Sequence, residues 1–115
     1  MNLLQETLHA LQDFGKSPKD VRWCGNQGSV WFTWEEFVEM SKDVEYDDWG
    51  DIRIAIDLLI VGDDWWLERQ YCEDEEWWQF ETLPKKPKAH KRGLKLITNE
   101  GDSELDLDSI NRSEQ

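Results

Sequence analysis

Cysteine is scarce in this sequence, and neither a long hydrophobic run nor a secretory signal is present. Cys24 and Cys72 are the only cysteines, and two thiols without CxxC spacing are too few for a disulfide scaffold. No stretch reaches the roughly 18 apolar residues that span a bilayer. The first 15 residues lack the basic start of a signal peptide. We therefore expect a reduced protein of the cytoplasm.

Catalytic signatures are also missing. The sequence has no GxSxG motif, no phosphate-binding glycine loop and no Cys/His nucleophile pattern. Carboxylates are so abundant that some pair will always fall near the spacing that suits general acid and base catalysis, so such a pair carries little information. The sequence predicts no enzyme and no cofactor. Sugar binding through stacked tryptophans stays open as an alternative.

Two groups of potential metal ligands lack the spacing that a metal site needs. The acidic loop Asp47–Asp51 does not have the spacing of an EF-hand or its closing glutamate. The two cysteines, with His9 and His90, contain no pair at zinc-ligand spacing. We predict no metal site, and we expect the thiols to be buried.

Negative charge is the most unusual property of the chain. Its 115 residues include 26 acidic and 13 basic side chains, for a net charge of −13. Residues 1–83 alone hold 20 acidic and 6 basic side chains, which gives −14. Such a surface repels nucleic acid and anionic membranes and accelerates encounter with basic surfaces. We expect a basic protein partner, no direct nucleic-acid contact and no membrane binding; the alternative is that the acidity serves solubility alone.

Aromatic content divides the chain into a folded part and a tail. All eight tryptophans precede residue 84, and burial of such side chains favours an ordered core. The remaining residues, 84–115, begin with a basic, Pro-punctuated stretch and end in an acidic stretch without aromatic residues. We predict one α+β domain over residues 1–83 and a disordered tail over 84–115, with a possible short strand at Gly93–Thr98.

The first half of the domain carries helix and hairpin signals. Asn2–Phe14 has a leucine stripe at Leu4, Leu8 and Leu11 and is followed by Gly15, which predicts a short amphipathic helix capped by Asn2. Glycines between Cys24 and Ser29 predict a small hairpin. Thr33 and Glu36 form a capping-box pattern, so a second helix should run from Trp34 to about Asp43.

The stretch Ile52–Leu83 predicts three antiparallel strands. Isoleucines alternate along Ile52–Val61, which is the period of a strand. Gly62-Asp63 fits a type II′ turn into a strand at Asp64–Tyr71, and a turn at Cys72–Glu75 leads into Glu76–Thr82. With the first hairpin, the expected fold is an antiparallel sheet of about three to five strands with two helices on one face.

Strand alternation separates two kinds of side chain in this region. Trp65, Leu67 and Tyr71 fall on one face, which the helices should cover. Trp66 and Trp77 fall on the other face, among Glu and Gln side chains. Tryptophan beside carboxylates on an open sheet is typical of an interface; the alternative is that these tryptophans pair across strands or lie under the tail.

Three stretches of the segment Trp34–Pro84 and its immediate flanks carry a resemblance: TWEEF opening a helix, DLLIVGDDWWLER across a turn, and EEWWQFETLPKKP closing a strand. This segment resembles small uncharacterised acidic proteins of Firmicute phages and prophages. The resemblance implies a phage origin and the cytoplasm of a bacterial host. Phage proteins of this kind include nucleic-acid mimics and inhibitors of host defence, such as anti-CRISPR and anti-restriction proteins.

These observations predict a phage protein that inhibits a host defence enzyme by binding its basic nucleic-acid site. The alternative is a non-enzymatic phage accessory or assembly protein that self-associates through its Trp-rich sheet. In the first case carboxylates replace phosphates and tryptophans anchor the contact. The predicted partner-binding residues are Glu35, Glu36, Glu39, Asp47, Asp48, Asp51, Trp66, Glu73, Asp74, Glu75, Glu76 and Trp77.

Overall fold

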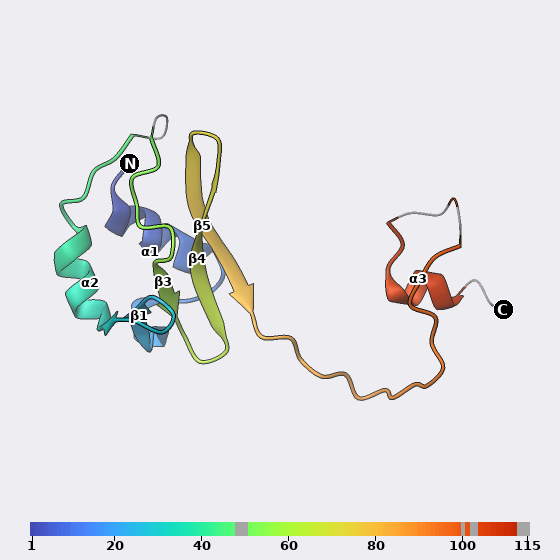
Figure 1. The fold of residues 1–115 in the computed structure, drawn as a ribbon. Coiled ribbons are helices and arrows are strands. Elements are labelled where there is room, and N and C mark those ends of the chain that lie inside the picture. The colour runs from blue at the N-terminus through green and yellow to red at the C-terminus, as the bar shows by residue number, and fades with distance from the viewer. Residues whose placement is uncertain (48–50, 100, 102–103, 113–115) are drawn as a thin grey trace. The chain divides into compact units, whose positions relative to one another are not determined.

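Figure 1 shows the fold of the protein in a computed structural model, which describes residues 1–47, 51–99, 101 and 104–112. The chain forms two compact units, Met1–Pro84 and Lys85–Gln115, which we call the body and the C-terminal unit. All eight tryptophans belong to the body. Within the described ranges, no helix is long and apolar enough to cross a membrane.

The body is built on one antiparallel sheet of five strands. The strands are β1 (Trp23–Gly25), β2 (Trp31–Phe32), β3 (Leu59–Val61), β4 (Trp65–Cys72) and β5 (Glu75–Thr82). Their order across the sheet is β2-β1-β3-β4-β5, with neighbouring strands antiparallel. The long β4–β5 hairpin therefore forms one edge of the sheet, and the short β1–β2 hairpin forms the other. The predicted α+β class and strand number are confirmed.

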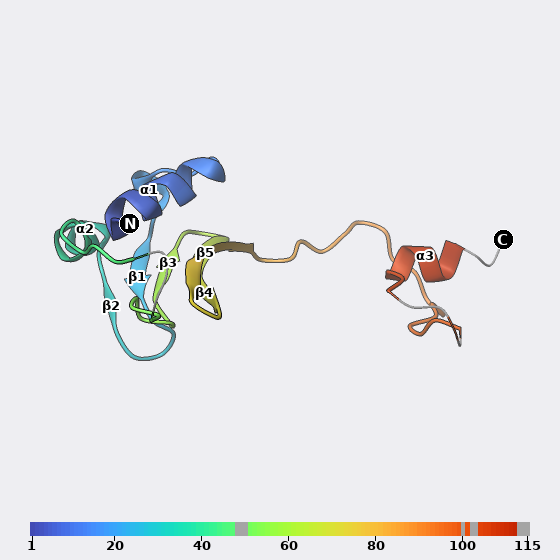
Figure 2. The ribbon, with the colours of Figure 1, turned by 90° about the horizontal axis from the view of Figure 1, so that it is seen from above.

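Two helices cover one face of this sheet (Figure 2). Helix α1 spans Leu3–Asp13 and begins at the cap Asn2, whose side chain accepts a hydrogen bond from the backbone N–H of Gln5. Helix α2 spans Trp34–Ser41 and begins with the predicted capping box between Thr33 and Glu36. A 3₁₀ turn at Pro18–Asp20 lies between α1 and β1. The caps were predictable because their hydrogen bonds are local in sequence.

The core lies between the helices and the covered face of the sheet. It includes Leu3 and Leu11 from α1, Phe37 from α2, and Ile60 and Leu67 from the central strands. The predicted leucine stripe of α1 was wrong in part, because the buried positions are Leu3, Thr7 and Leu11. Thr7 is buried because its hydroxyl donates to the Leu3 carbonyl and accepts from the Trp78 indole.

The predicted strand Ile52–Val61 is mostly not a strand. Only Leu59–Val61 pairs with β1 and β4, while residues 52–58 are irregular. Ile54 is buried but Ile56 is exposed, so the alternation of isoleucines does not mark two sheet faces. The backbone N–H groups of Arg53 and Ile54 instead donate to the side-chain carboxylate of Glu76, 2.8 and 3.1 Å away. A side chain thus replaces the neighbouring strand as hydrogen-bond acceptor.

The turn between β3 and β4 lies one residue later than predicted. Gly62 pairs with Trp65 through a 2.9 Å backbone hydrogen bond, so the loop is Asp63-Asp64. Gly62 is required for a different reason: a Cβ at this position would lie 2.1 Å from the Trp65 indole. The next turn, Glu73-Asp74 between Cys72 and Glu75, was predicted correctly. Glu73 adopts a φ of 57°, which is unusual for a residue with a side chain.

The C-terminal unit contains regular structure that the sequence did not indicate. Residues Leu107–Arg112 form helix α3. The Asn111 side chain accepts from the backbone N–H of Lys95 and donates to the Lys95 carbonyl, which ties the helix to residues near the start of the unit. The strand predicted at Gly93–Thr98 is not formed. Helix α3 was not predicted from the sequence.

Candidate functional site

A buried arginine lies on the covered face of the β4–β5 hairpin. Arg69 of β4 is 4% exposed, and its guanidinium forms ion pairs with Glu6 of α1 at 3.2 Å and Glu76 of β5 at 2.9 Å. Its Cζ atom lies 4.8 Å from the centre of the Trp78 ring. Sequence reasoning missed this residue. The available signal was its position in β4, where Trp65, Leu67 and Arg69 alternate on the same face.

Tyr46 completes this buried network. Its hydroxyl donates a short hydrogen bond to Glu6 and accepts a longer one, 3.4 Å, from Arg69. Burial, aided by the Glu6 carboxylate, raises the pKa of Tyr46 to about 12. The network joins α1, the segment after α2, and both strands of the β4–β5 hairpin. Its charged groups bind one another, so we assign it a structural role.

Glu76 belongs to this network and not to the molecular surface. Its side chain is 5% exposed, and it accepts hydrogen bonds from Arg69 and from two backbone N–H groups. From its sequence neighbours, Glu76 was predicted to be a partner-binding carboxylate. The structure instead places it in the body's interior, because the alternation of β5 turns it inward beside Trp78. We therefore remove Glu76 from the partner-binding set.

The neighbouring predicted carboxylates are exposed and lie at one end of the sheet. Glu73 and Asp74 form the β4–β5 turn and Glu75 begins β5, and all three are exposed. The hydrogen bonds from Arg53 and Ile54 to Glu76 hold the segment that follows Asp51 against this hairpin. Asp51, which comes directly before this segment in the sequence, is also exposed. We call Asp51, Glu73, Asp74 and Glu75 the acidic end.

Other predicted carboxylates are not brought together with the acidic end by the described contacts. Glu35, Glu36 and Glu39 are exposed on α2, which packs on α1 and β1. Glu39 forms a 2.8 Å ion pair with Lys42, and Glu36 serves the helix cap. Asp47 is exposed, and Asp48 lies outside the described residues.

Internal ion pairs neutralise only a small part of the body's acidity. Among the described residues, four carboxylates of the body pair with Lys or Arg: Glu6, Glu39, Asp63 and Glu76. Two of these four share Arg69. The acidic end has no such pair among the described side chains. Most of the body's described carboxylates therefore have no Lys or Arg partner.

The open face of the sheet carries tryptophan and carboxylate side chains, as predicted. Register places Trp23 of β1, Val61 of β3 and Trp66 of β4 in one row. Trp66 is half-buried, and Trp77 is 38% exposed. These two tryptophans are not cross-strand partners, because Trp66 faces Glu81 and Trp77 faces Gln70.

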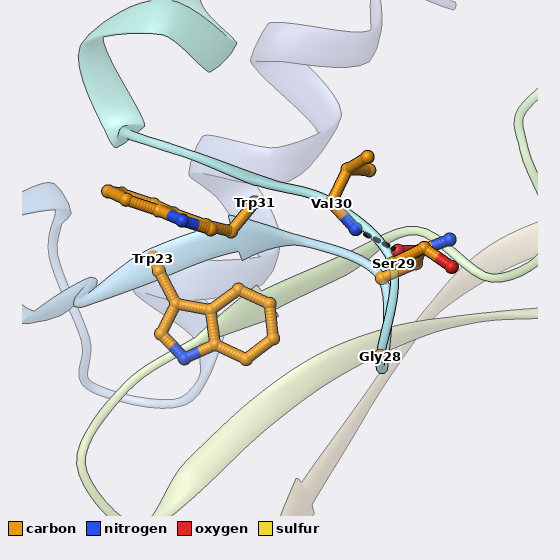
Figure 3. Close-up of a pocket in the computed structure, with 6 residues that line it drawn as sticks. Trp23, Gly28, Ser29, Val30 and Trp31 are labelled. Carbon is orange, nitrogen blue, oxygen red and sulfur yellow. Dashed lines mark hydrogen bonds between the residues drawn. The ribbon is translucent and has the colours of Figure 1, made fainter.

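Two hollows lie on this side of the body, and Trp23 lines both. The hairpin pocket, about 500 Å³, lies at the β1–β2 hairpin between Trp23, Val30 and Trp31, with the loop residues Gly28 and Ser29 (Figure 3). The sheet groove, about 560 Å³, has mainly apolar walls and two carboxylates. Its lining residues are Trp23, Gln27, Ile56, Asp57, Leu59, Val61, Trp66, Glu68 and Arg69. Sequence reasoning found Trp66 but missed Trp23 and Trp31, which flank the hairpin glycines.

No protein-family model matches this chain, and no match was found among curated proteins or solved structures. The resemblance of Trp34–Pro84 to phage proteins therefore stays a prediction. Within the described part of the chain, no group of three or more His, Cys, Asp or Glu side chains is placed to hold a metal ion. The candidate functional surfaces are thus the acidic end and the two hollows of the open face.

Proposed function

We propose that this protein is a non-enzymatic phage inhibitor that occupies a basic nucleic-acid-binding surface of a host defence enzyme, such as a CRISPR effector or a restriction enzyme. The observation that supports this function is the acidic end. Its exposed carboxylates have no Lys or Arg partner among the described residues. They belong to a body with a net charge of −14.

The acidic end is held in place by the fold beneath it. Glu73 and Asp74 form a two-residue turn between paired strands, and Glu76 fixes the adjacent chain by accepting two backbone hydrogen bonds. The backbone that carries these carboxylates is therefore already ordered, so less conformational entropy is lost when a partner binds. The carboxylates project from it as negative charges that can take the place of phosphates.

This charge favours a basic protein over nucleic acid as the partner. Like charges repel the phosphate backbone, whereas a basic groove gains from long-range attraction and faster encounter. Salt screens such attraction, with a Debye length of about 8 Å at physiological ionic strength. Binding should therefore weaken steeply as salt rises, mainly through a slower association rate.

The test is direct binding of the purified full chain to a panel of purified CRISPR effectors and restriction enzymes. Association and dissociation rates are measured at several salt concentrations, and nucleic acid is added as a competitor. We expect at least one enzyme to bind, with an association rate that falls with salt, and to lose its nucleic acid when the inhibitor is added. Failure of every enzyme to bind, or simultaneous binding of inhibitor and nucleic acid, would contradict the proposal.

A pair of charge variants tests the location of the contact. The triple variant Glu73→Gln, Asp74→Asn, Glu75→Gln removes three charges from the acidic end. Its control removes three exposed charges elsewhere, with Asp13→Asn, Asp43→Asn and Asp64→Asn. We expect the first variant to lose about tenfold or more in affinity, roughly 1.4 kcal/mol, and the control to lose much less. Equal losses would show that total charge, and not the acidic end, determines binding.

A further inference from the structure

The sheet groove combines aromatic walls with carboxylates. Trp23 and Trp66 stand on β1 and β4, one on either side of Val61 of β3. Strands two positions apart in a sheet are separated by about 10 Å. That spacing leaves room for one flat group between two indoles. Asp57 and Glu68 line the same groove.

Both carboxylates are held by neighbouring donors. Glu68 accepts from the Trp66 indole N–H and from the Gln70 amide, each at 2.8 Å, through different oxygens. Asp57 accepts from the Asn26 amide at 3.0 Å through Oδ2. Neither carboxylate forms an ion pair with a described Lys or Arg. Each carboxylate oxygen can accept more than one hydrogen bond, so both carboxylates can still accept hydrogen bonds from a ligand.

The two carboxylates of the groove favour a ligand that donates hydrogen bonds. Asn26, Trp66 and Gln70 each donate one hydrogen bond to these carboxylates, and the Gln27 amide also lines the groove. What remains from Asp57 and Glu68 is acceptor capacity and negative charge. A sugar hydroxyl both donates and accepts, whereas a guanidinium has five donors and no acceptor. A guanidinium is also planar, stacks on an indole and pairs with carboxylates, which an ammonium group does less well.

We propose that the sheet groove binds an arginine side chain of a partner protein, with the guanidinium against the Trp66 and Trp23 indoles and hydrogen-bonded to Glu68 or Asp57. The charges of Asp57 and Glu68 are complementary to this cation, because the guanidinium of Arg69, which also lines the groove, is already paired with Glu6 and Glu76. The inference rests on the proposed function in one respect: it takes the partner to be basic. It adds a point of side-chain recognition to what would otherwise be attraction between charged surfaces.

The test is an NMR titration of the full chain with a capped Gly-Arg-Gly peptide. The indole N–H signals of Trp23 and Trp66 report on the groove. The corresponding citrulline peptide is the control, because citrulline has nearly the same shape without the charge. We expect saturable shifts at both indoles and about tenfold tighter binding of arginine than of citrulline. Equal binding of the two peptides, or no saturable shift, would overturn the proposal.

Two groove variants and one matched control localise the binding. Trp66→Leu removes an aromatic wall, and Glu68→Gln removes a charge while keeping a side-chain acceptor for the indole. Trp31→Leu is the control, because Trp31 is 69% exposed and lines the hairpin pocket but not the sheet groove. We expect each groove variant to weaken the arginine peptide by about tenfold and the control to change it less than twofold. Should Trp66→Leu fail to fold, Glu68→Gln still decides the matter.

Three further outcomes separate this proposal from its competitors. Saturation of the same indole signals by a neutral oligosaccharide, but not by the arginine peptide, would identify a sugar site. Shifts of these signals on dilution without any peptide would show that a second copy of the chain occupies the groove. The acidic-end triple variant should still bind the arginine peptide normally. An inhibitor that fails against every enzyme but binds this peptide would refute the proposed function and leave the arginine site standing.

Discussion

The two faces of the β4–β5 hairpin differ in whether their charged side chains form ion pairs. On the covered face, Arg69 is buried and its cation is matched by two carboxylates of the same chain. On the open face, the adjacent Glu68 is held by uncharged donors, and no described cation pairs with it. Two consecutive residues thus carry opposite charges to opposite sides of one strand. The difference teaches that the buried charge of Arg69 is neutralised within the chain, whereas the charge of Glu68 is held in position but not neutralised.

The largest expected effect comes from breaking the covered-face network. Arg69→Met leaves Glu6 and Glu76 without a cation, although both side chains are largely buried. Removing one partner of a buried pair costs about 3–5 kcal/mol of unfolding free energy. Urea unfolding followed by tryptophan fluorescence measures this change. Arg22→Met is the control, because the Arg22–Asp63 pair is exposed and should matter little; similar losses in both variants would contradict the structural role of Arg69.

Two neighbouring tryptophans of β5, Trp77 and Trp78, differ in how deeply they are buried. Trp78 is 8% exposed and donates to Thr7, whereas Trp77 on the other face is 38% exposed. Trp78→Leu should destabilise the body by about 2 kcal/mol, less than full truncation to alanine would. Trp77→Leu should have a clearly smaller effect in the same urea titration. Equal destabilisation would show that the open face is packed as tightly as the covered one.

The buried thiol of Cys24 makes the stability of the body depend on pH in the alkaline range. Burial, with a smaller contribution from Glu35, raises the pKa of Cys24 to about 12 from its ordinary value of 9.0. Above pH 9 the unfolded chain loses this proton while the folded chain keeps it, so deprotonation favours unfolding. The stability that Cys24 contributes is therefore complete below pH 9 and is lost as the pH rises towards 12.

The measurement is the urea midpoint as a function of pH. Cys24→Ala should flatten the decline between pH 9 and 12, although Tyr46 contributes in an overlapping range because its pKa is also about 12. Cys72→Ala is the matched control, since that thiol is exposed, and it should leave the decline as steep as in the natural sequence. A decline that Cys24→Ala does not change would contradict this assignment.

The smallest expected effect is at the turn that sets the register of the two faces. Glu73 has a φ of 57°, a conformation that asparagine adopts more easily than glutamate. Glu73→Asn should raise the unfolding free energy by about 0.5–1 kcal/mol. Asp74→Asn removes the same charge without changing a left-handed residue, so it separates backbone strain from repulsion. An equal gain in both variants would assign the effect to charge alone.

Local signals in the sequence predicted local structure well. The cap at Asn2, the capping box at Thr33 and the turn at Glu73-Asp74 all depend on residues within a few positions of one another. The alternation of β4 and β5 separated the two faces correctly, since each strand runs for eight residues and period two is easy to recognise over that length.

What escaped prediction depends on contacts between distant residues. The isoleucines after Asp51 have the period of a strand, but their backbone donors bind Glu76, more than 20 positions away. Arg69 is paired with a glutamate 63 positions away, so no local pattern shows that it is buried. The sheet groove requires Trp23 and Trp66 to meet across β3, which only the strand order reveals.

Strand β5 lies at the edge of the sheet, and an edge strand can pair with the edge strand of another copy of the protein. Among the described strands, β5 pairs only with β4, so its outer backbone groups are a template on which another strand could add. Glu75 and Glu81 lie along this edge, and the opposite edge, β2, is only two residues long. Two such edges repel each other at neutral pH. The acidity that we assign to recognition therefore also protects the protein against aggregation through its own sheet.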